Sequence, residues 1–331
     1  MKKYNVAIVG ATGMVGNMFL KVLEERKLPV DTYYLYASER SAGKVIDFMG
    51  KPHTVIELKK ENIVDKKIDF ALFSAGGGTS RDFAPVFAEH GAIVVDNSSQ
   101  WRMYPDVPLV VPEVNGDAAL KHHGIIANPN CSTIQAMLPL KALDDAFSIK
   151  RVVYSTYQAV SGAGVAGYND LKNGAKGEDL KKFPHQIVAN VLPQIDVFLD
   201  NGYTKEEEKM MKETKKILEN DNIKVTATTV RVPVFHGHSE SINIEFNKPC
   251  TLEGIMNALR GKPGMVLCEK AEDYPMPVDA EGHDEVYVGR VRLDDTVESG
   301  CNLWVVADNI RKGAATNAVQ IVEYLINKEA E

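Results

Sequence analysis

Residues 4–16 of this 331-residue chain read YNVAIVGATGMVG. Its apolar run from Tyr4 to Val9 stops at Gly10, and apolar residues then recur at helical spacing from Met14 to Glu25. This change of period across a glycine turn predicts a buried strand followed by a helix. The glycines also allow a ligand's pyrophosphate to approach the backbone. Because the spacing is GxxGxxG and not the commoner GxGxxG, a tight turn without a ligand is the alternative.

More apolar runs follow this first one, and they are continuous, as in strands that a parallel sheet buries on both faces. They lie at residues 33–36, 70–73, 93–95 and 109–111. A helix over residues 79–89 can cover the sheet. We therefore predict an α/β, Rossmann-type domain with a mostly parallel sheet, formed by residues 1–128 and a C-terminal segment, 314–331, that contains an amphipathic helix.

From about residue 148 the apolar residues alternate and threonine becomes more frequent. This pattern is typical of a mixed or antiparallel sheet with one face covered. The expected strands are residues 151–160, 223–232, 241–246, 285–293 and 302–307. Residues 205–219 predict a charged helix with one apolar stripe that includes Met210 and Ile217. We predict an α+β domain with a mixed sheet over residues 129–313.

Composition limits the partners of the chain. With 38 basic and 45 acidic side chains, its net charge of -7 gives no general reason to bind nucleic acid or an anionic membrane. No apolar stretch approaches the ~20 residues of a membrane helix, and the N-terminal run lacks a cleavage site, so we expect a cytoplasmic protein. The cysteines form no CxxC pair, and no metal site is expected. Cys250, Cys268 and Cys301 suggest no function.

The residues after the second apolar run bear on the choice of cofactor. A carboxylate there would bind the ribose of NAD, whereas an arginine would bind the extra phosphate of NADP. The sequence YASERS, residues 36–41, places Arg40 between Ser38 and Ser41. Glu39 is the type of residue that an NAD enzyme would use. We favour a 2'-phosphate pocket for NADP, and the alternative is a surface Glu–Arg pair without function.

Cys131 stands at the expected start of a helix, after the turn formed by residues 128–130. Asn130 is a favourable N-cap, which would place the Cys131 sulfur near the free amides of the first turn. Such a field lowers the pKa of a thiol and favours a nucleophile, and the same amides can stabilise an oxyanion. A cysteine at this position is nevertheless more often structural than catalytic, so the pattern alone leaves both interpretations open.

Several motifs occur in the order found in one enzyme family. They are GATGMVG (10–16), NPNCST (128–133), YQAVSGAG (157–164), ETKK (213–216), RVPVFHGHSE (231–240) and DN-x3-GAATN (308–317). In this combination the chain resembles the aspartate-semialdehyde dehydrogenases from end to end, in particular the bacterial enzymes with a short ETKK segment. The resemblance implies NADPH-dependent conversion of L-aspartyl-4-phosphate to L-aspartate 4-semialdehyde and phosphate, in lysine, diaminopimelate, threonine and methionine biosynthesis. It also implies a homodimer joined through the second, catalytic domain.

The resemblance also assigns roles to single residues. Cys131 matches the nucleophile that forms a thioester, His238 the acid/base histidine, and Gln158 the glutamine that orients the substrate. The implied substrate contacts are Arg231 for the α-carboxylate, Glu213 for the α-ammonium, Lys216 and Arg102 for the phosphate, and Asn130 beside the nucleophile. From composition alone, Glu213 and Lys216 would be a solvated pair and Arg102 a surface charge. His236 is interpreted as a loop residue.

The NADP contacts implied by the resemblance come from both domains. They are Gly10, Thr12, Gly13, Met14 and Val15 in the first turn, Ser38, Arg40 and Ser41 at the adenosine end, Ser161 and Gly162 in the SGAG loop, and Asn317 near the C-terminus. Small residues in the SGAG loop would let the backbone approach the cofactor closely.

Three other functions use some of the same features. An N-acetyl-gamma-glutamyl-phosphate reductase would form the same thioester, but its acetylated substrate has no use for Glu213. Glyceraldehyde phosphate dehydrogenase shares the chemistry with a different cysteine and histidine setting. A redox-sensing NADP-binding protein could use Cys131 as an oxidisable thiol, but it would need neither Arg231 nor the phosphate-binding cations.

Overall fold

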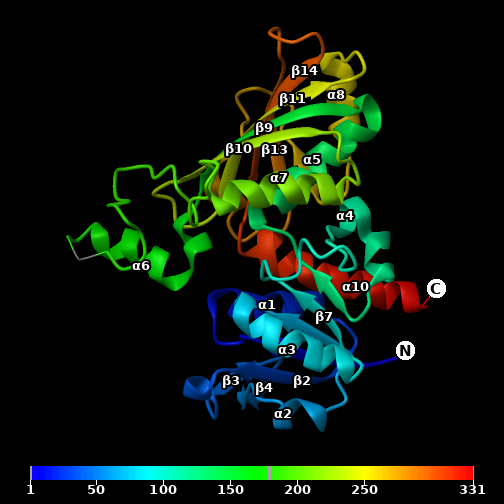
Figure 1. Ribbon diagram of the computed structural model, residues 1–331, viewed down its shortest axis with the longest axis vertical. Helices are drawn as coiled ribbons and strands as arrows, with labels where there is room; N and C mark the ends of the chain where they lie inside the picture. Colours follow the sequence, from blue (N-terminus) through cyan, green and yellow to red (C-terminus); the bar gives the residue numbers. More distant parts are fainter. Residues whose placement is uncertain (1, 178–179, 331) are drawn as a thin grey trace. The chain divides into compact units, whose positions relative to one another are not determined.

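The computed structural model describes residues 2–177 and 180–330, and its contacts define two compact units (Figure 1). The first unit comprises Met1–Pro129 and Ala314–Glu331, and the second comprises Asn130–Gly313. The chain therefore passes between the units twice, after Pro129 and after Gly313. Each helix in residues 2–177 and 180–330 is too short or too polar to span a lipid bilayer.

The first unit is built on a six-stranded parallel sheet in the order β5-β2-β1-β6-β7-β8. The strands are β1 (Tyr4–Val9), β2 (Val30–Ala37), β5 (Ile56–Glu57), β6 (Phe70–Phe73), β7 (Ile93–Asp96) and β8 (Ile125–Ala127). The order of the strands reverses between β1 and β6, and ligands of open α/β sheets bind at the carboxyl ends of the strands at such a point. The predicted Rossmann-type parallel sheet is confirmed.

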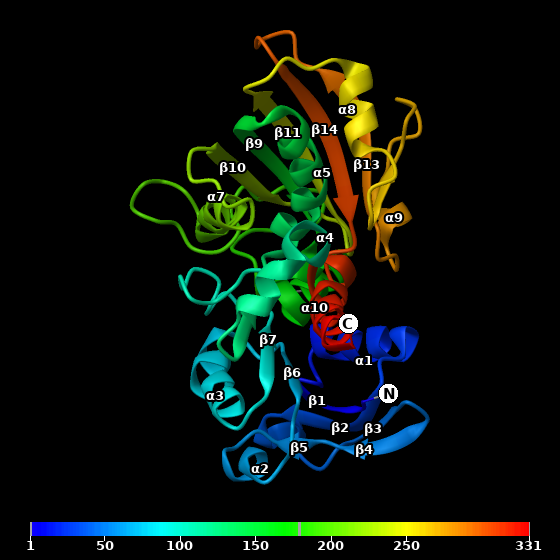
Figure 2. The same ribbon diagram turned by 90° about the vertical axis from the view of Figure 1, so that its right-hand side faces the viewer.

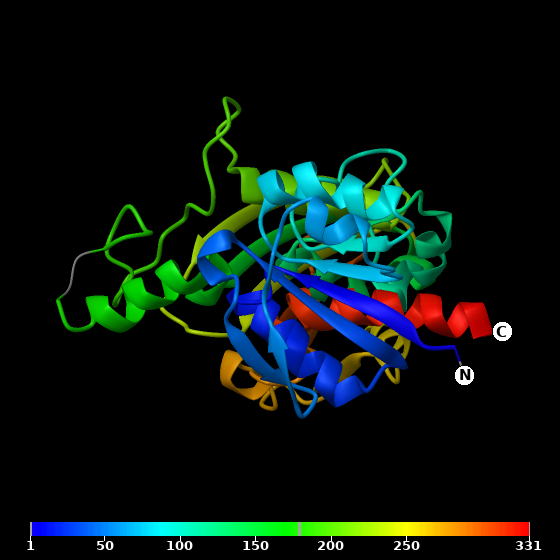
Figure 3. The same ribbon diagram turned by 90° about the horizontal axis from the view of Figure 1, so that it is seen from below.

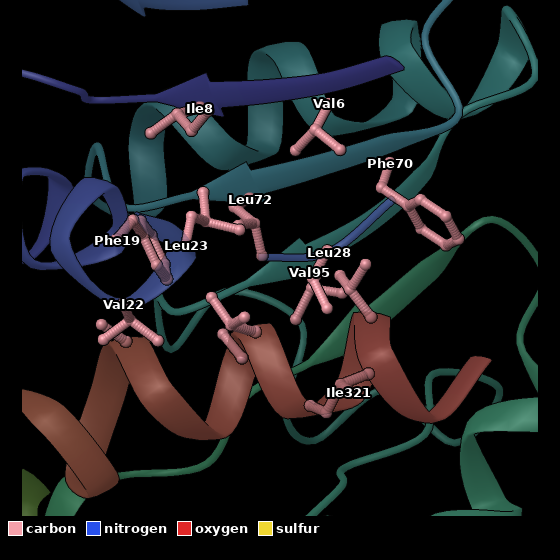
Figure 4. Packing of buried hydrophobic residues seen from close by; sticks show 14 of the residues in the cluster. Val6, Ile8, Phe19, Val22, Leu23, Leu28, Phe70, Leu72, Val95 and Ile321 are labelled. Carbon is pink, nitrogen blue, oxygen red and sulfur yellow. The ribbon is translucent and has the colours of Figure 1, made fainter. Parts of the chain in front are cut away.

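Helices cover both faces of this sheet. One face packs against α1 (Met14–Arg26) and α10 (Thr316–Ala330), and the other against α2 (Glu61–Val64) and α3 (Gly77–Glu89). Figure 4 shows the first of these apolar layers, to which β1 contributes Ile8, α1 Phe19 and α10 Ile321. The two ends of the chain lie side by side in Figure 3. An ion pair joins Lys2 to Glu329 there. Smaller elements are the hairpin β3 (Val45–Phe48) and β4 (Lys51–Thr54), α4 (Pro112–Asn115), and the 3-10 helices Glu39–Ser41 and Gly116–Lys121.

One predicted strand is wrong. The apolar run 109–111 makes only a single parallel bridge, from Leu109 to Ala127. Pro108 and Pro112 enclose the run, and a proline has no N–H to donate to a strand ladder. Pro112 instead occupies the first turn of α4, where its missing donor costs nothing.

The second unit contains a six-stranded mixed sheet in the order β10-β9-β11-β14-β13-β12 (Figure 2). Its strands are β9 (Ile149–Gln158), β10 (Lys224–Arg231), β11 (His238–Phe246), β12 (Met265–Leu267), β13 (Val286–Leu293) and β14 (Gly300–Ala307). Its helices are α5 (Cys131–Phe147), α6 (Gly164–Gly174), α7 (Lys205–Ile217), α8 (Leu252–Leu259) and α9 (Pro277–Ala280), with a 3-10 helix at Val160–Ala163 and a π-helix at Arg311–Ala315. The predicted α+β unit with a mixed sheet is confirmed.

One face of this sheet is buried and carries the residues of interest. In β9 the side chains of Tyr154, Thr156 and Gln158 are buried, whereas Tyr157 between them is 41% exposed. Helices α5 and α7 lie against the buried face, where the Tyr154 hydroxyl is 2.8 Å from Thr214 Oγ1 of α7. Because side chains alternate along a strand, every second residue of β9 and β11 points to these helices.

β11 begins three residues earlier than its predicted start at Ser241. Residues 238–240 already pair with both β9 and β14, so His238 is a strand residue. Gly237, with φ of +84°, makes the turn that precedes it. His236 lies in the loop before this turn, as interpreted from the sequence.

Candidate active site

The first turn of α5 begins at Cys131, and Asn130 caps it. The Asn130 Oδ1 accepts hydrogen bonds from the backbone N–H groups of Ser132, at 3.0 Å, and Thr133, at 3.3 Å. The predicted N-cap is therefore confirmed. Cys131 is partly exposed and lies at the positive end of a 17-residue helix, a position that favours the thiolate.

Two buried carboxylates of α7 hold Asn130 from the other side. Glu213 Oε2 accepts the backbone N–H of Asn130 at 2.7 Å, and Glu206 Oε1 accepts from its side-chain Nδ2 at 2.8 Å. Glu213 is 1% exposed and Glu206 is 5% exposed. The solvated pair expected from composition is therefore wrong for Glu213, whereas Lys216 is partly exposed.

Sequence reasoning missed Glu206, although the sequence carried a signal for it. Glu206 and Glu213 are seven residues apart, so they lie on one face of α7 together with Met210 and Ile217 of the predicted apolar stripe. A carboxylate within an apolar stripe is a buried charge and needs a partner. Here that partner is the residue before Cys131.

Gln158 and His238 lie side by side at the edge of the buried face. The last residue of β9 is Gln158 and the first of β11 is His238, and the pairing of Ser239 with Tyr157 brings these ends together. Gln158 Oε1 accepts from Thr156 Oγ1 at 3.0 Å, and its Nε2 donates to Glu206 Oε1 at 3.2 Å. Gln158 is therefore held through both ends of its amide.

The contacts of His238 define its tautomer. Its Nδ1 accepts the backbone N–H of Ala159 at 3.0 Å, so in the neutral ring the proton is on Nε2. Across the described parts of the chain, Nε2 has no hydrogen-bond partner. Burial and the nearby charge of Arg231 lower the pKa of His238 well below its ordinary value. The ring is therefore neutral and presents an N–H donor.

Arg231 and His238 share one small space, which Gly162 leaves open. A Cβ at Gly162 would lie 2.9 Å from Arg231 Nη1 and 3.2 Å from His238 Nε2. Arg231 is the last residue of β10, is buried, and donates from Nη1 to the Ala159 carbonyl at 2.6 Å. Burial lowers the pKa of Arg231, and the charges of Glu206 and Cys131 oppose this. A cationic fork thus acts electrostatically on the cysteine.

Gly313 is a second glycine that sequence reasoning did not connect with the site. A Cβ at Gly313 would lie 2.9 Å from the Cys131 Cβ and 3.3 Å from its Cα. Any larger residue would therefore displace Cys131. The position follows the chain's DN turn, where the backbone N–H of Gly313 donates to the Asp308 carbonyl at 3.0 Å.

In the first unit, the surface charge expected for Arg102 is wrong. Arg102 is 7% exposed, and its guanidinium donates to the carbonyls of Asn128, at 2.9 Å, and Asn97, at 3.0 Å. Asn317 is fully buried, and its Nδ2 donates to the Val110 carbonyl and to Asn128 Oδ1. Both residues therefore fix the backbone around the end of β8.

The residues predicted to bind the cofactor in the first unit gather at the carboxyl ends of β1 and β2. Gly10 has φ of +88°, and a Cβ there would lie 2.4 Å from the Ser74 carbonyl oxygen after β6. Thr12 Oγ1 is 3.5 Å from Ser41 Oγ, so the two predicted segments meet. Gly13, Ser38 and Arg40 are exposed, and Met14, Val15 and Ser41 are partly exposed.

In the second unit, Ser161 is buried and its Oγ accepts from Asn309 Nδ2 at 3.0 Å. No group of histidine, cysteine and acidic side chains in the described ranges is arranged to hold a metal ion.

Comparison with known proteins places both units in one class. Residues 5–122 match the family model described as "Semialdehyde dehydrogenase, NAD binding domain", and residues 140–312 match "Semialdehyde dehydrogenase, dimerisation domain". These matches define an oxidoreductase that uses a nicotinamide cofactor.

Similar proteins narrow the class. Curated relatives named aspartate-semialdehyde dehydrogenase include those of Aquifex aeolicus, 59% identical over 98% of both chains, and Bacillus subtilis, 47% identical over 97% of both. Among solved structures, Vibrio cholerae aspartate semialdehyde dehydrogenase II complexed with ASA has a TM-score of 0.95 and 49% identity over 99% of both chains. The Candida albicans enzyme with NADP has a TM-score of 0.79 and 28% identity over 99% of both. The chain belongs to the aspartate-semialdehyde dehydrogenase family.

Glu240 of β11 is another buried carboxyl group of the second unit. It lies two positions after His238 on the same face of β11 and opposite Thr156 of β9. It is fully buried, and neither carboxyl oxygen has a hydrogen-bond partner among the residues that the structure describes. Burial raises the pKa of Glu240 well above its ordinary value, so the group favours its neutral acid form.

Glu240→Gln should therefore stabilise the protein at neutral and alkaline pH. Because the folded state holds the Glu240 proton more tightly than the unfolded state, the stability from this group is complete below pH ~4.3 and is lost as the pH rises through the folded pKa. The variant should melt a few degrees higher than the wild type at pH 8 and equally at pH 4. Thermal unfolding across this range measures the difference.

The matched control is Glu245→Gln on the same strand, where the carboxylate is paired with Lys150. It should not raise the melting temperature at pH 8. A Glu240→Gln variant whose melting temperature follows that of the wild type at every pH would contradict the prediction.

Proposed function

We propose that the enzyme converts L-aspartyl-4-phosphate to L-aspartate 4-semialdehyde and phosphate with NADPH, through a thioester on Cys131. The capped start of α5, with Cys131 as its first residue, carries this proposal. The same unit contains the neutral His238, the cationic Arg231 and the fixed amide of Gln158. The product would serve lysine, diaminopimelate, threonine and methionine biosynthesis.

The first chemical step is a displacement at an acyl phosphate. The Cys131 thiolate attacks the acyl carbon, a carbon–sulfur bond forms, and the bond to the phosphate oxygen breaks with its electron pair on phosphate. Amides of the first turn of α5 stabilise the oxyanion that develops during the attack. We assign His238 as the acid/base group. In its neutral form the ring donates a hydrogen bond from Nε2–H to the developing oxyanion, and Gln158 orients the carbonyl.

Reduction completes the reaction. NADPH, when bound, would supply the hydride that converts the thioester to the oxyanion of a hemithioacetal. Collapse of this species breaks the carbon–sulfur bond and returns its electron pair to Cys131, which releases the aldehyde and restores the thiolate.

The proposed substrate contacts are four charged residues. Arg231 provides a bidentate fork for the α-carboxylate, for which lysine is a poor substitute. Glu213 is the expected partner of the α-ammonium group, and Lys216 and Arg102 those of the phosphate. Asn130 holds the substrate beside the nucleophile.

The residues of the first unit fit a dinucleotide. The first turn of α1 has Gly13 as its N-cap and no side-chain cap, so its amides are available to a pyrophosphate. The proposed first-turn contacts are Gly10, Thr12, Gly13, Met14 and Val15, and Ser161, Gly162 and Asn317 are further proposed contacts of the cofactor. We assign NADP because Arg40 stands exposed between Ser38 and Ser41 after β2.

We also propose an assembly and a location for the enzyme. The match of residues 140–312 to a dimerisation domain supports a homodimer joined through the second unit. We assign the enzyme to the cytoplasm, with a small-molecule substrate and without nucleic acid or membrane partners.

Purified enzyme should form NADPH from NADP, L-aspartate semialdehyde and phosphate, the reverse of the proposed reaction. N-acetyl-glutamate semialdehyde, assayed in parallel, should give no product because its acetylated nitrogen cannot pair with Glu213. Absorbance of NADPH follows both reactions. Turnover of the acetylated substrate alone would refute the proposed substrate.

Cys131→Ala should abolish this turnover and leave NADPH binding intact, because the nucleophile and the glycine turn belong to different units. Steady-state rates and cofactor fluorescence measure the two properties. Cys268→Ala, which changes another partly buried thiol, is the control and should keep wild-type rates. Normal turnover by the Cys131 variant would exclude the thioester.

Arg40→Ala should weaken NADPH binding by roughly 10-fold to 100-fold, the contribution of a charge-assisted contact to phosphate. NADH lacks the 2'-phosphate, so its affinity should change little. Titration of both cofactors into Arg40→Ala and a control variant, Lys21→Ala on the exposed side of α1, tests this. An equal loss for NADPH and NADH would remove Arg40 from the phosphate pocket.

A further inference from the structure

Glu206 connects two residues of the site through a single oxygen atom. Its Oε1 accepts from Asn130 Nδ2 at 2.8 Å and from Gln158 Nε2 at 3.2 Å. Its Oε2 accepts from Lys209 Nζ at 3.1 Å. Helices α5 and α7 lie beside each other in the second unit (Figure 1). The Glu206 carboxylate of α7 therefore links the residue that caps α5 to the last residue of β9.

Glu206 is ionised despite its burial. Burial alone would raise its pKa, but the charge of Lys209 and the hydrogen bonds from Asn130 and Gln158 more than compensate, so that the pKa is lowered. Two positive charges lie near Glu206: Lys209 on its own helix and Arg231 on β10. Two negative charges are also near: Asp196, which is paired with Lys209, and Glu213, about two turns along α7.

An ionised carboxylate accepts hydrogen bonds and cannot donate them, and this determines the orientation of both amides. The amide nitrogens of Asn130 and Gln158 must face Glu206. The Asn130 oxygen is thereby directed to the amides of α5, and the Gln158 oxygen to Thr156 Oγ1. Without a charge at this position, the Gln158 amide could turn by 180°, because the Thr156 hydroxyl can accept as well as donate. The Asn130 oxygen would stay at the amides of α5, but its amide nitrogen would lose the charged acceptor that holds it.

We propose that Glu206 is a positioning residue that orients the amides of Asn130 and Gln158 and so fixes the nucleophile and the substrate-orienting donor together. This inference rests on the proposed function, in which Cys131 attacks and Gln158 orients the carbonyl. Glu206 acts through these residues and makes no contact of its own with the reacting atoms.

The start of α7 does not depend on Glu206, because its neighbour Glu207 already serves that purpose. Thr204 and Glu207 form a capping box in which Glu207 Oε2 accepts the backbone N–H of Thr204 at 2.7 Å. Glu207 Oε1 accepts the backbone N–H of Thr229 at 2.9 Å. The two adjacent glutamates, 5% and 7% exposed, therefore have different roles. Glu207 caps the helix, and Glu206 binds the residues of the site.

Because both are buried glutamates in the first turn of α7, Glu206→Gln and Glu207→Gln form a matched pair of variants. Both remove one buried charge from the same turn, so both should lower the melting temperature. At a temperature where both are folded, kcat for L-aspartate semialdehyde should fall roughly 10-fold to 100-fold in Glu206→Gln, as expected for misplaced reacting groups. Its KM should change less than about threefold, because Arg231 still binds the carboxylate. Glu207→Gln should keep the wild-type kcat.

A second pair keeps Glu206 and changes its counter-ion. Lys209→Gln removes the charge that lowers the Glu206 pKa, so Glu206 should protonate at a higher pH. Protonation gives the carboxyl a donor, and kcat should therefore decline on the acid side at a higher pH than in the wild type. Lys212→Gln, which breaks the exposed pair with Glu208, is the control and should leave the pH profile unchanged.

Activity of the wild-type enzyme decides the proposed function separately. Equal kcat values for Glu206→Gln and Glu207→Gln would overturn the positioning role. A Lys209→Gln pH profile that superimposes on that of Lys212→Gln would overturn it as well, even if Glu206→Gln does not fold.

Discussion

Asn130 is held by hydrogen bonds at its backbone N–H, its side-chain nitrogen and its side-chain oxygen, and these bonds set the geometry of the site. The backbone N–H and the side-chain nitrogen bind carboxylates of α7, and the side-chain oxygen binds amides of α5. These bonds admit one orientation of the residue and therefore one position of Cys131 after it. Met210 and Ile217 of the apolar stripe are buried on the same face of α7 as the two carboxylates. Hydrophobic packing thus determines where the nucleophile stands.

The buried ionisable side chains of this site reduce the stability of the second unit. Burying a charge costs several kcal/mol unless hydrogen bonds and an opposite charge compensate. Asn130 donates hydrogen bonds to Glu206 and Glu213, and Lys209 supplies the opposite charge for Glu206. Arg231 is compensated by the Ala159 carbonyl and the charge of Glu206. Glu240 has no such partner in the described ranges and favours its neutral acid form. Conflicts between local preference and burial are expected where a fold serves chemistry.

The regular parts of the chain were readable from the sequence, because the period of the apolar residues reports which faces are buried. Both sheets, α7 and the cap at Asn130 followed from such local rules. Glu206 and the burial of Glu213 did not, since a glutamate on a charged helix is ordinarily solvated and only the tertiary partner reverses this. The strand at 109–111 failed because two prolines prevent its ladder. The roles of Cys131 and His238 came from motif resemblance, and the contacts add the tautomer that no sequence rule provides.

The two places where the chain passes between the units both lie next to Cys131. On the side of the second unit, the crossings end at Asn130 and Gly313. The first is the neighbour of Cys131 along the chain, and the second is its neighbour in space. Both ends of the second unit's chain therefore meet at the nucleophile. A residue inserted at either junction would displace Cys131, so the length of the chain is fixed at these two points.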